Sequence, residues 1–148
     1  MDYYSISDAP LPALLLQGCF HEALRADEVS KRLETLRTFL PDSLQSYITA
    51  VSEEIKTSSR LLRDMADLSQ AHIPRVPVIL SYLHVLLPCL CRSLRDITNY
   101  YDDKALTKEL RWRTMYHKMT DEAGGLPLPQ RFTMYNHFLT LLAQLLTR

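Results

Sequence analysis

Apolar residues recur alternately three and four positions apart through most of the chain, the spacing typical of helices that pack lengthwise against one another. Residues 76–101 show this pattern most clearly. Its periodic apolar positions are Val76, Leu80, Leu83, Leu87, Leu90, Leu94, Ile97 and Tyr101. The first part of this stretch is apolar on nearly every side, which indicates a central helix surrounded by other helices or by lipid. Pro88 removes a backbone hydrogen bond there, so we expect a kink.

Two helices are predicted before residue 72. The first is capped by Asp8 and runs to residue 40, either unbroken or with a joint near residues 25–27. Its apolar positions are Leu15, Cys19, Ala26, Val29, Leu33, Leu36 and Leu40, with Glu22 as the one misfit. The second begins at Asp42 or Ser43 and runs to about residue 71. Its apolar positions are Leu44, Ile48, Val51, Ile55, Leu62 and Met65, with Ser58 in the same row.

Two more helices are predicted after the central one. The fourth begins at Asp102 or Asp103 and runs to about Ala123, followed by Gly124 as a helix-ending residue. Its apolar stripe is Trp112, Tyr116, Met119 and Ala123. The last follows the proline-containing bend 126–129 and continues to the end of the chain. Its apolar positions are Phe132, Tyr135, Leu139, Leu142 and Leu146.

The predicted fold is therefore all-α, an antiparallel up-and-down bundle of four to five long helices. Residues 1–148 are long enough to form one domain with its own core. The last predicted helix shows no C-terminal cap, so we expect the domain to belong to a longer chain.

Composition and charge narrow the function classes. Seventeen basic and seventeen acidic residues cancel, which argues against a nucleic-acid partner. Residues 1–74 carry a net −4 (7 Lys/Arg, 11 Asp/Glu) and residues 75–148 a net +4 (10 and 6), as expected for halves that pack together. Three cysteines and the lack of a secretory signal at the N-terminus favour a reduced intracellular, cytoplasmic protein. The longest apolar run has sixteen residues, short of the roughly 20 that span a bilayer.

No motif indicates a metal, a cofactor or catalysis. Cys89 and Cys91 are two positions apart on a helix, so their sulfur atoms diverge. The sequence contains no His-Glu-x-x-His, phosphate-binding loop or nucleophile elbow. We therefore expect no metal or cofactor and no catalytic residues. Pro74 and Pro77 match the minimal PxxP pattern, but their position at the start of a helix is the preferred explanation.

One candidate docking face lies on the predicted fourth helix. Lys104, Lys108, Arg111 and Lys118 fall on one side of it, beside the aromatic stripe. Such a face is either plain solvated surface or a docking patch for an acidic protein or an anionic lipid.

The C-terminal stretch YHKMTDEAGGLPLPQRFTMYNHFLTLLAQLLTR, residues 116–148, resembles helical regions of large proteins from filamentous fungi. In general character the whole chain resembles the helical N-terminal modules of fungal NLR-type (STAND) signalling proteins. This resemblance implies an intracellular, non-enzymatic module of a longer protein, and it assigns no residue a role.

Three functional hypotheses follow, in order of preference. The first is a non-catalytic protein-interaction or scaffolding module, whose partner is another protein or another domain of its own chain. The second is a peripheral domain that binds an anionic membrane surface. The third is an enzyme of unidentified type.

Overall fold

The computed structural model describes residues 11–101, 107, 110–111, 113–114 and 128–148. Its long helices are α1 (Leu11–Arg37), α2 (Asp42–Ala71), α3 (Val76–Tyr101) and α5 (Leu128–Thr147), and the short 3₁₀ helix η1 (Ile73–Arg75) joins α2 to α3. No strand occurs in this part of the chain. The all-α class and the helical bundle predicted from the sequence are confirmed.

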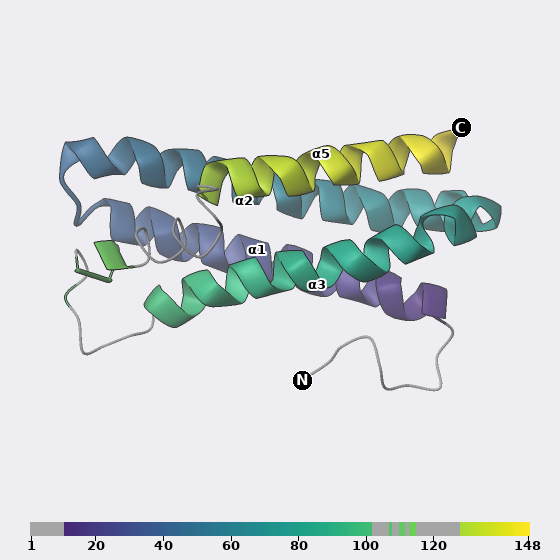
Figure 1. Ribbon diagram of the computed structural model, residues 1–148, viewed down its shortest axis with the longest axis horizontal. Coiled ribbons are helices and arrows are strands. Elements are labelled where there is room, and N and C mark those ends of the chain that lie inside the picture. The colour runs from purple at the N-terminus through teal and green to yellow at the C-terminus, as the bar shows by residue number, and fades with distance from the viewer. Residues whose placement is uncertain (1–10, 102–106, 108–109, 112, 115–127) are drawn as a thin grey trace.

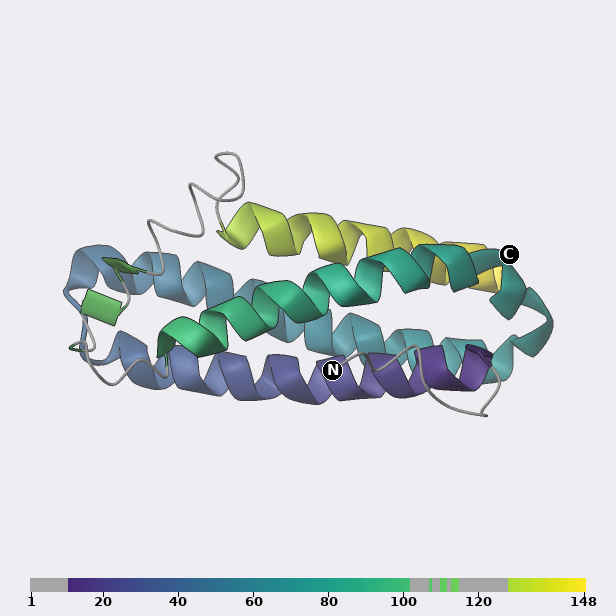
Figure 2. The ribbon, with the colours of Figure 1, turned by 60° about the horizontal axis from the view of Figure 1, so that its bottom comes forward.

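Each long helix packs mainly against two others, so that α1, α2, α5 and α3 follow one another around the bundle. Chain direction reverses from α1 to α2 and from α2 to α3, and α5 runs opposite to α3 (Figure 1). The side-by-side pairs α1/α2 and α3/α5 are therefore antiparallel. The pairs α1/α3 and α2/α5 lie side by side in the same direction. Both views show α3 diverging from α5 toward Tyr101 (Figure 2).

The helix α1 is continuous. The first predicted helix is therefore unbroken and has no joint near residues 25–27. All seven of its predicted apolar positions are buried, and so is the misfit Glu22. The helix ends three residues earlier than predicted. There, the amide nitrogens of Phe39 and Leu40 donate to the carbonyl oxygens of Leu36 and Arg37 at 3.0 and 3.1 Å, which forms a tight turn before Pro41.

The helix α3 has the predicted bounds and stays helical through Pro88. Its predicted core positions from Val76 to Ile97 are buried, except Leu80, which is half-buried. The Arg75 Nη2 atom in η1 donates a hydrogen bond to the Leu145 carbonyl oxygen at 3.0 Å, so the α2–α3 joint is tied to the end of α5. The fourth predicted helix lies largely outside the described residues.

Candidate functional site

One side of the bundle lacks charge. Residues 76–91 of α3 and residues 132–147 of α5 contain no Asp, Glu, Lys or Arg. Exposed positions on α1 and α2 are often charged, as in most soluble proteins. These exposed charged residues are Glu28, Lys31, Arg37, Asp42, Glu53, Lys56, Arg60, Asp64 and Asp67. The difference sets the α3–α5 side apart from the rest of the surface.

Large apolar side chains are exposed on this uncharged side. They form one row on α3 and one on α5, each with the spacing i, i+4, i+7 that keeps residues on one face of a helix. The rows are Val78, Tyr82 and Val85 on α3, and Met134, Phe138 and Leu141 on α5. Val85 is 66% exposed, the largest value among these six. Such clustering differs from the scattered apolar residues found on most surfaces.

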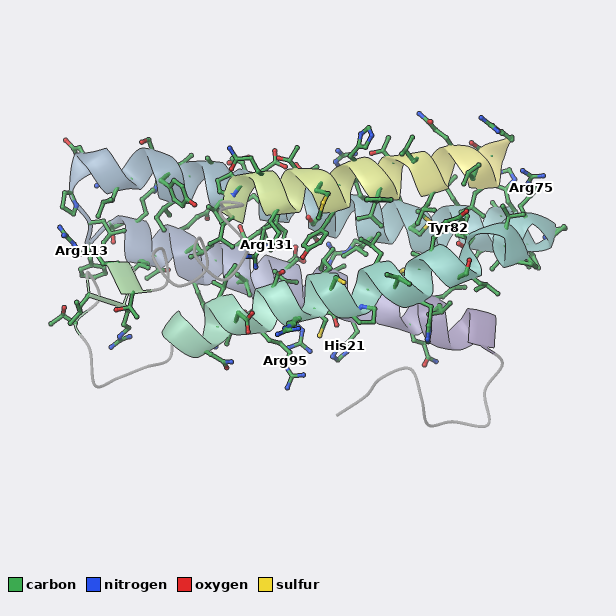
Figure 3. The ribbon with its side chains drawn as sticks, in the orientation of Figure 1. His21, Arg75, Tyr82, Arg95, Arg113 and Arg131 are labelled. Atoms are coloured by element: carbon green, nitrogen blue, oxygen red, sulfur yellow. The ribbon has the colours of Figure 1, made fainter. Side chains whose placement is uncertain are left out.

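A groove with a volume of about 260 Å³ runs between α3 and α5. We call it the α3–α5 groove. The labelled Tyr82 lies on the part of α3 that adjoins α5 (Figure 3). The residues lining the groove are Ser81, Tyr82, Val85, Leu86 and Cys89 from α3, and Met134, Tyr135, Phe138 and Leu142 from α5. Leu86 and Leu142 are buried and belong to its floor, whereas Val85 and Phe138 are exposed beside it.

The polar atoms at one end of the groove already have partners. The hydroxyl groups of Tyr135 and Ser93 share a hydrogen bond of 2.8 Å that links α5 to α3. The same tyrosine hydroxyl donates to the Cys89 carbonyl oxygen at 3.4 Å. Burial raises the pKa of Tyr135, with Ser93 opposing the change. This hydroxyl therefore supports packing and is not positioned as a catalytic acid or base.

Among the described residues, charged side chains lie at both ends of the groove. Arg131 lies one turn before Met134, and Arg131 and Asp96 both act electrostatically on Tyr135. Arg92 is exposed and follows Val85 by seven residues, which places it on the same face of α3. The opposite end, toward Val78 and Leu142, adjoins Arg75 of η1, whose Nη2 atom donates to the Leu145 carbonyl oxygen.

The three cysteines differ in exposure. Cys89 is exposed and lines the groove, whereas Cys19 and Cys91 are buried. Burial, aided by the nearby negative charge of Glu22, raises the pKa of Cys19 to about 12 and also raises the pKa of Cys91. Both buried thiols are therefore protonated at neutral pH and poor nucleophiles.

The buried carboxylate of Glu22 is a second polar feature of the bundle. Its side chain is fully buried between α1 and α3, where its Oε1 atom accepts a hydrogen bond from Arg25 Nε at 3.0 Å. Its Oε2 atom has no hydrogen-bond partner among the described residues. Because burial and the charge of Glu22 raise the pKa values of the neighbouring thiols, this cluster holds no thiolate nucleophile at neutral pH.

The predicted basic face cannot be placed as a surface. Lys104, Lys108 and Lys118 lie outside the described residues, and so does the aromatic stripe beside them. Arg111 is partly buried, and its amide nitrogen donates to the Thr107 carbonyl oxygen at 2.8 Å. The suggestion that these four residues form a docking face stays a prediction.

Metal binding and membrane crossing are two further possibilities for the described residues. Within the part of the chain that the structure describes, no group of three or more His, Cys, Asp or Glu side chains is placed to hold a metal ion. One helical stretch, Ile73–Asn99, is long and apolar enough to cross a membrane, although the core helix of a soluble protein can be equally long and apolar.

Comparison with known proteins gives no family: no family model, curated protein or solved structure matches this chain.

The α3–α5 groove was missed by the sequence analysis, although a signal for it was present. The apolar spacing alone indicates only that the first part of residues 76–101 is apolar on nearly every side. The more informative feature was the complete lack of charge at the outer positions of residues 76–91 and 132–147. A helix covered only by its own bundle keeps charged residues on its solvent side.

Proposed function

We propose that this protein is a non-catalytic interaction module that binds another protein in the α3–α5 groove. The observation that carries the proposal is the pairing of two exposed apolar rows on adjacent, charge-free helix segments with a groove between them. Protein interfaces are depleted of charge at their centre and enriched in aromatic and Met side chains. Tyr82, Met134 and Phe138 give the groove that composition.

The chemistry of the described residues supports a binding role over an enzymatic one. The Tyr135 hydroxyl is engaged by Ser93, and the thiols of Cys19 and Cys91 are held in their protonated forms. Cys89 stands in the groove without a histidine among the lining residues. The expectation of an intracellular location within a longer protein stays a prediction.

Binding to an anionic membrane is the second candidate, because Ile73–Asn99 is apolar enough to enter lipid. Two features favour a protein partner instead. The groove is concave, whereas membrane-binding surfaces insert protruding side chains. Clusters of about four to eight basic residues are typical of anionic-lipid sites, and the described basic residues near the groove are Arg92 and Arg131 at one end and Arg75 at the other. Co-sedimentation with neutral and anionic vesicles at two salt concentrations tests this candidate.

A displayed library of random peptides tests the proposed function without assuming any partner. The matched variants are Val85→Lys in the groove and Leu24→Lys on α1, because these two side chains are 66% and 64% exposed. We expect selected peptides to lose binding to Val85→Lys and to keep binding to Leu24→Lys. The same peptides should protect Cys89 from a maleimide reagent, since its thiol lines the groove.

Two results would overturn the proposed function. One is that no peptide is enriched, or that enriched peptides bind Val85→Lys as well as the unchanged protein. The other is that Cys89 resists maleimide in the free protein under native conditions, because the groove would then be covered already.

A further inference from the structure

We infer that the α3–α5 groove has a narrow and a wide form, because the half of α3 after Pro88 pivots away from α5 and the Tyr135 hydroxyl holds the narrow form. The inference goes beyond the proposed function, since it describes a movement of the free protein that sets the width of the groove. Four observations carry it: the limited contact between α3 and α5, one fixed end, a proline inside α3, and hydrogen bonds that join the two helices just past that proline.

The contact between α3 and α5 is the least extensive of the four side-by-side pairs among the described residues. Both views show α3 diverging from α5 toward Tyr101 (Figures 1 and 2). Each of the two helices packs more extensively against its other neighbour, α3 against α1 and α5 against α2. The α2–α5 pair includes Asn136 Nδ2, which donates to the Glu54 carbonyl oxygen at 3.0 Å. Regions with few contacts open first, so the bundle opens most easily between α3 and α5.

The end of this pair near Val76 is fixed. There, the Arg75 Nη2 atom donates to the Leu145 carbonyl oxygen at 3.0 Å, which joins η1 to the last turn of α5. The short helix η1 also packs against α2, and Val76 is buried directly after it. Hydrogen bonds from a charged donor are stronger than neutral ones. Any separation of α3 from α5 therefore increases with distance from Arg75 and is largest toward Tyr101.

Pro88 gives α3 a point at which it can bend. It lies inside the helix, and because proline lacks an amide hydrogen, it cannot donate to the His84 carbonyl oxygen. Prolines are among the commonest causes of sharp bends in helices. Pro88 lies within the groove-lining part of α3, between Leu86 and Cys89. Residues 89–101 extend about 20 Å beyond it at 1.5 Å per residue, so a bend of about 20° would move the end of α3 by roughly 7 Å.

The hydroxyl group of Tyr135 joins α5 to the first turn of α3 after Pro88. It shares a hydrogen bond of 2.8 Å with the Ser93 hydroxyl and donates to the Cys89 carbonyl oxygen at 3.4 Å. The side chains of Tyr135 and Ser93 are buried, so water competes little for these bonds while the groove is narrow. A neutral hydrogen bond contributes only modestly to stability. These bonds can therefore break and re-form while all four long helices stay folded.

Distances between paired spin labels, measured by double electron–electron resonance in the free protein, test the movement. One pair, at Asn99 of α3 and Gln130 of α5, lies at the end toward Tyr101. The control pair, at Ser81 and Gln144, lies at the end near Arg75. All four labelled side chains are exposed. We expect two populations about 5 Å apart for the first pair and one narrow distribution for the control pair.

The labels are attached to cysteines introduced in a Cys89→Ser background. Cys19 and Cys91 are buried, so they should not react under native conditions. A sample without introduced cysteines measures any residual labelling, and circular dichroism of each labelled protein confirms that the fold is retained.

Two variants should act in opposite directions. Tyr135→Phe removes the hydroxyl and keeps the ring, so the long-distance population of the first pair should rise at least about threefold. Pro88→Ala restores an amide donor to the helix, so that population should fall at least about threefold. Tyr82→Phe, at an exposed tyrosine that lines the groove before Pro88, should leave it unchanged. A general loss of stability would not move the first two variants in opposite directions.

Three results would overturn the inference. The first is a single narrow distribution for the Asn99–Gln130 pair that Tyr135→Phe does not change. The second is a long-distance population that Pro88→Ala leaves unchanged, because the pivot would then lie elsewhere. The third is equal broadening of both label pairs, which would mean that the Arg75 end is not fixed. No partner is present in these measurements, so failure of the peptide library to yield a ligand would overturn the proposed function and leave the movement intact.

Discussion

At the scale of single residues, some buried polar groups have complete hydrogen bonding and a few have an atom with no partner among the described residues. Asn136 on α5 is an example of the first kind. Its Oδ1 atom accepts from Ser58 Oγ at 2.6 Å, and its Nδ2 atom donates to the Glu54 carbonyl oxygen at 3.0 Å. Polar pairs at such core positions commonly fix the register of neighbouring helices. Glu22 is of the second kind, because its Oε2 atom is buried and has no hydrogen-bond partner among the described residues.

Replacing Glu22 by leucine should therefore leave the protein as stable as before or more stable. Exchanging a buried charged group for an apolar residue of similar size is often neutral or stabilising by about 1–4 kcal/mol. Arg25 is 22% exposed, so its guanidinium keeps contact with water after the change. Urea unfolding measures the effect, with Glu28→Leu on the exposed face as control. A loss of more than about 1 kcal/mol in Glu22→Leu would show that the carboxylate contributes to stability.

The ion pair between Asp27 and Arg63 predicts a pH dependence. The Arg63 Nη2 atom donates to Asp27 Oδ2 at 2.7 Å, and this bond, opposed in part by burial, lowers the pKa of Asp27. Stability from the pair is therefore present above the ordinary carboxyl pKa of about 4 and is lost as pH falls through the lowered value. Both side chains are more than one-third exposed, so the contribution should stay within about 1 kcal/mol.

Asp27→Asn tests this dependence. Its free energy of unfolding in urea should be lower than that of the unchanged protein at pH 7, and the difference should shrink at pH 3. Asp67→Asn, at an exposed position of α2, serves as the control. A difference of equal size at both pH values would mean that protonation of Asp27 is not its cause.

At the scale of helices, the sequence determined more about the core than about the surface. The three-and-four spacing identified which side of α3 is buried, because that side packs against α1 and α5. It also predicted that the first part of α3 is surrounded by other helices or by lipid, and within the bundle Tyr82 and Val85 are left exposed by the described helices. Periodicity reports how apolar each position is, whereas the number of neighbours around a helix depends on where other helices pack.

Leu87 and Val85 are a buried and an exposed apolar position on the same helix. Leu87 is fully buried and Val85 is 66% exposed. Leu87→Ala should reduce the free energy of unfolding by roughly 2–5 kcal/mol, the usual cost of emptying a buried leucine site. Val85→Ala should change it by no more than about 0.5 kcal/mol. Urea unfolding measures both, and an effect below about 1 kcal/mol for Leu87→Ala would mean that α3 is not central to the core.

At the scale of the whole molecule, contacts join all four long helices into one core. A single cluster of buried residues includes members from α1, α2, α3 and α5. Hydroxyl pairs add to it: Ser30 and Ser52 link α1 to α2 at 2.9 Å, and Ser93 and Tyr135 link α3 to α5. We therefore expect the α1/α2 and α3/α5 pairs to unfold together, as is usual for single domains of this size.

The two buried cysteines report on this cooperativity, because Cys19 lies in α1 and Cys91 in α3. In a Cys89→Ser variant, modification of each thiol can be followed by mass spectrometry as urea increases. Both thiols should become reactive over the same range of urea, and helicity measured by circular dichroism should fall over that range. Reaction of Cys91 at urea concentrations where Cys19 is still protected would show that α3 separates before α1. In that case the α3–α5 groove would belong to a less stable half of the bundle, and binding a partner would stabilise that half selectively.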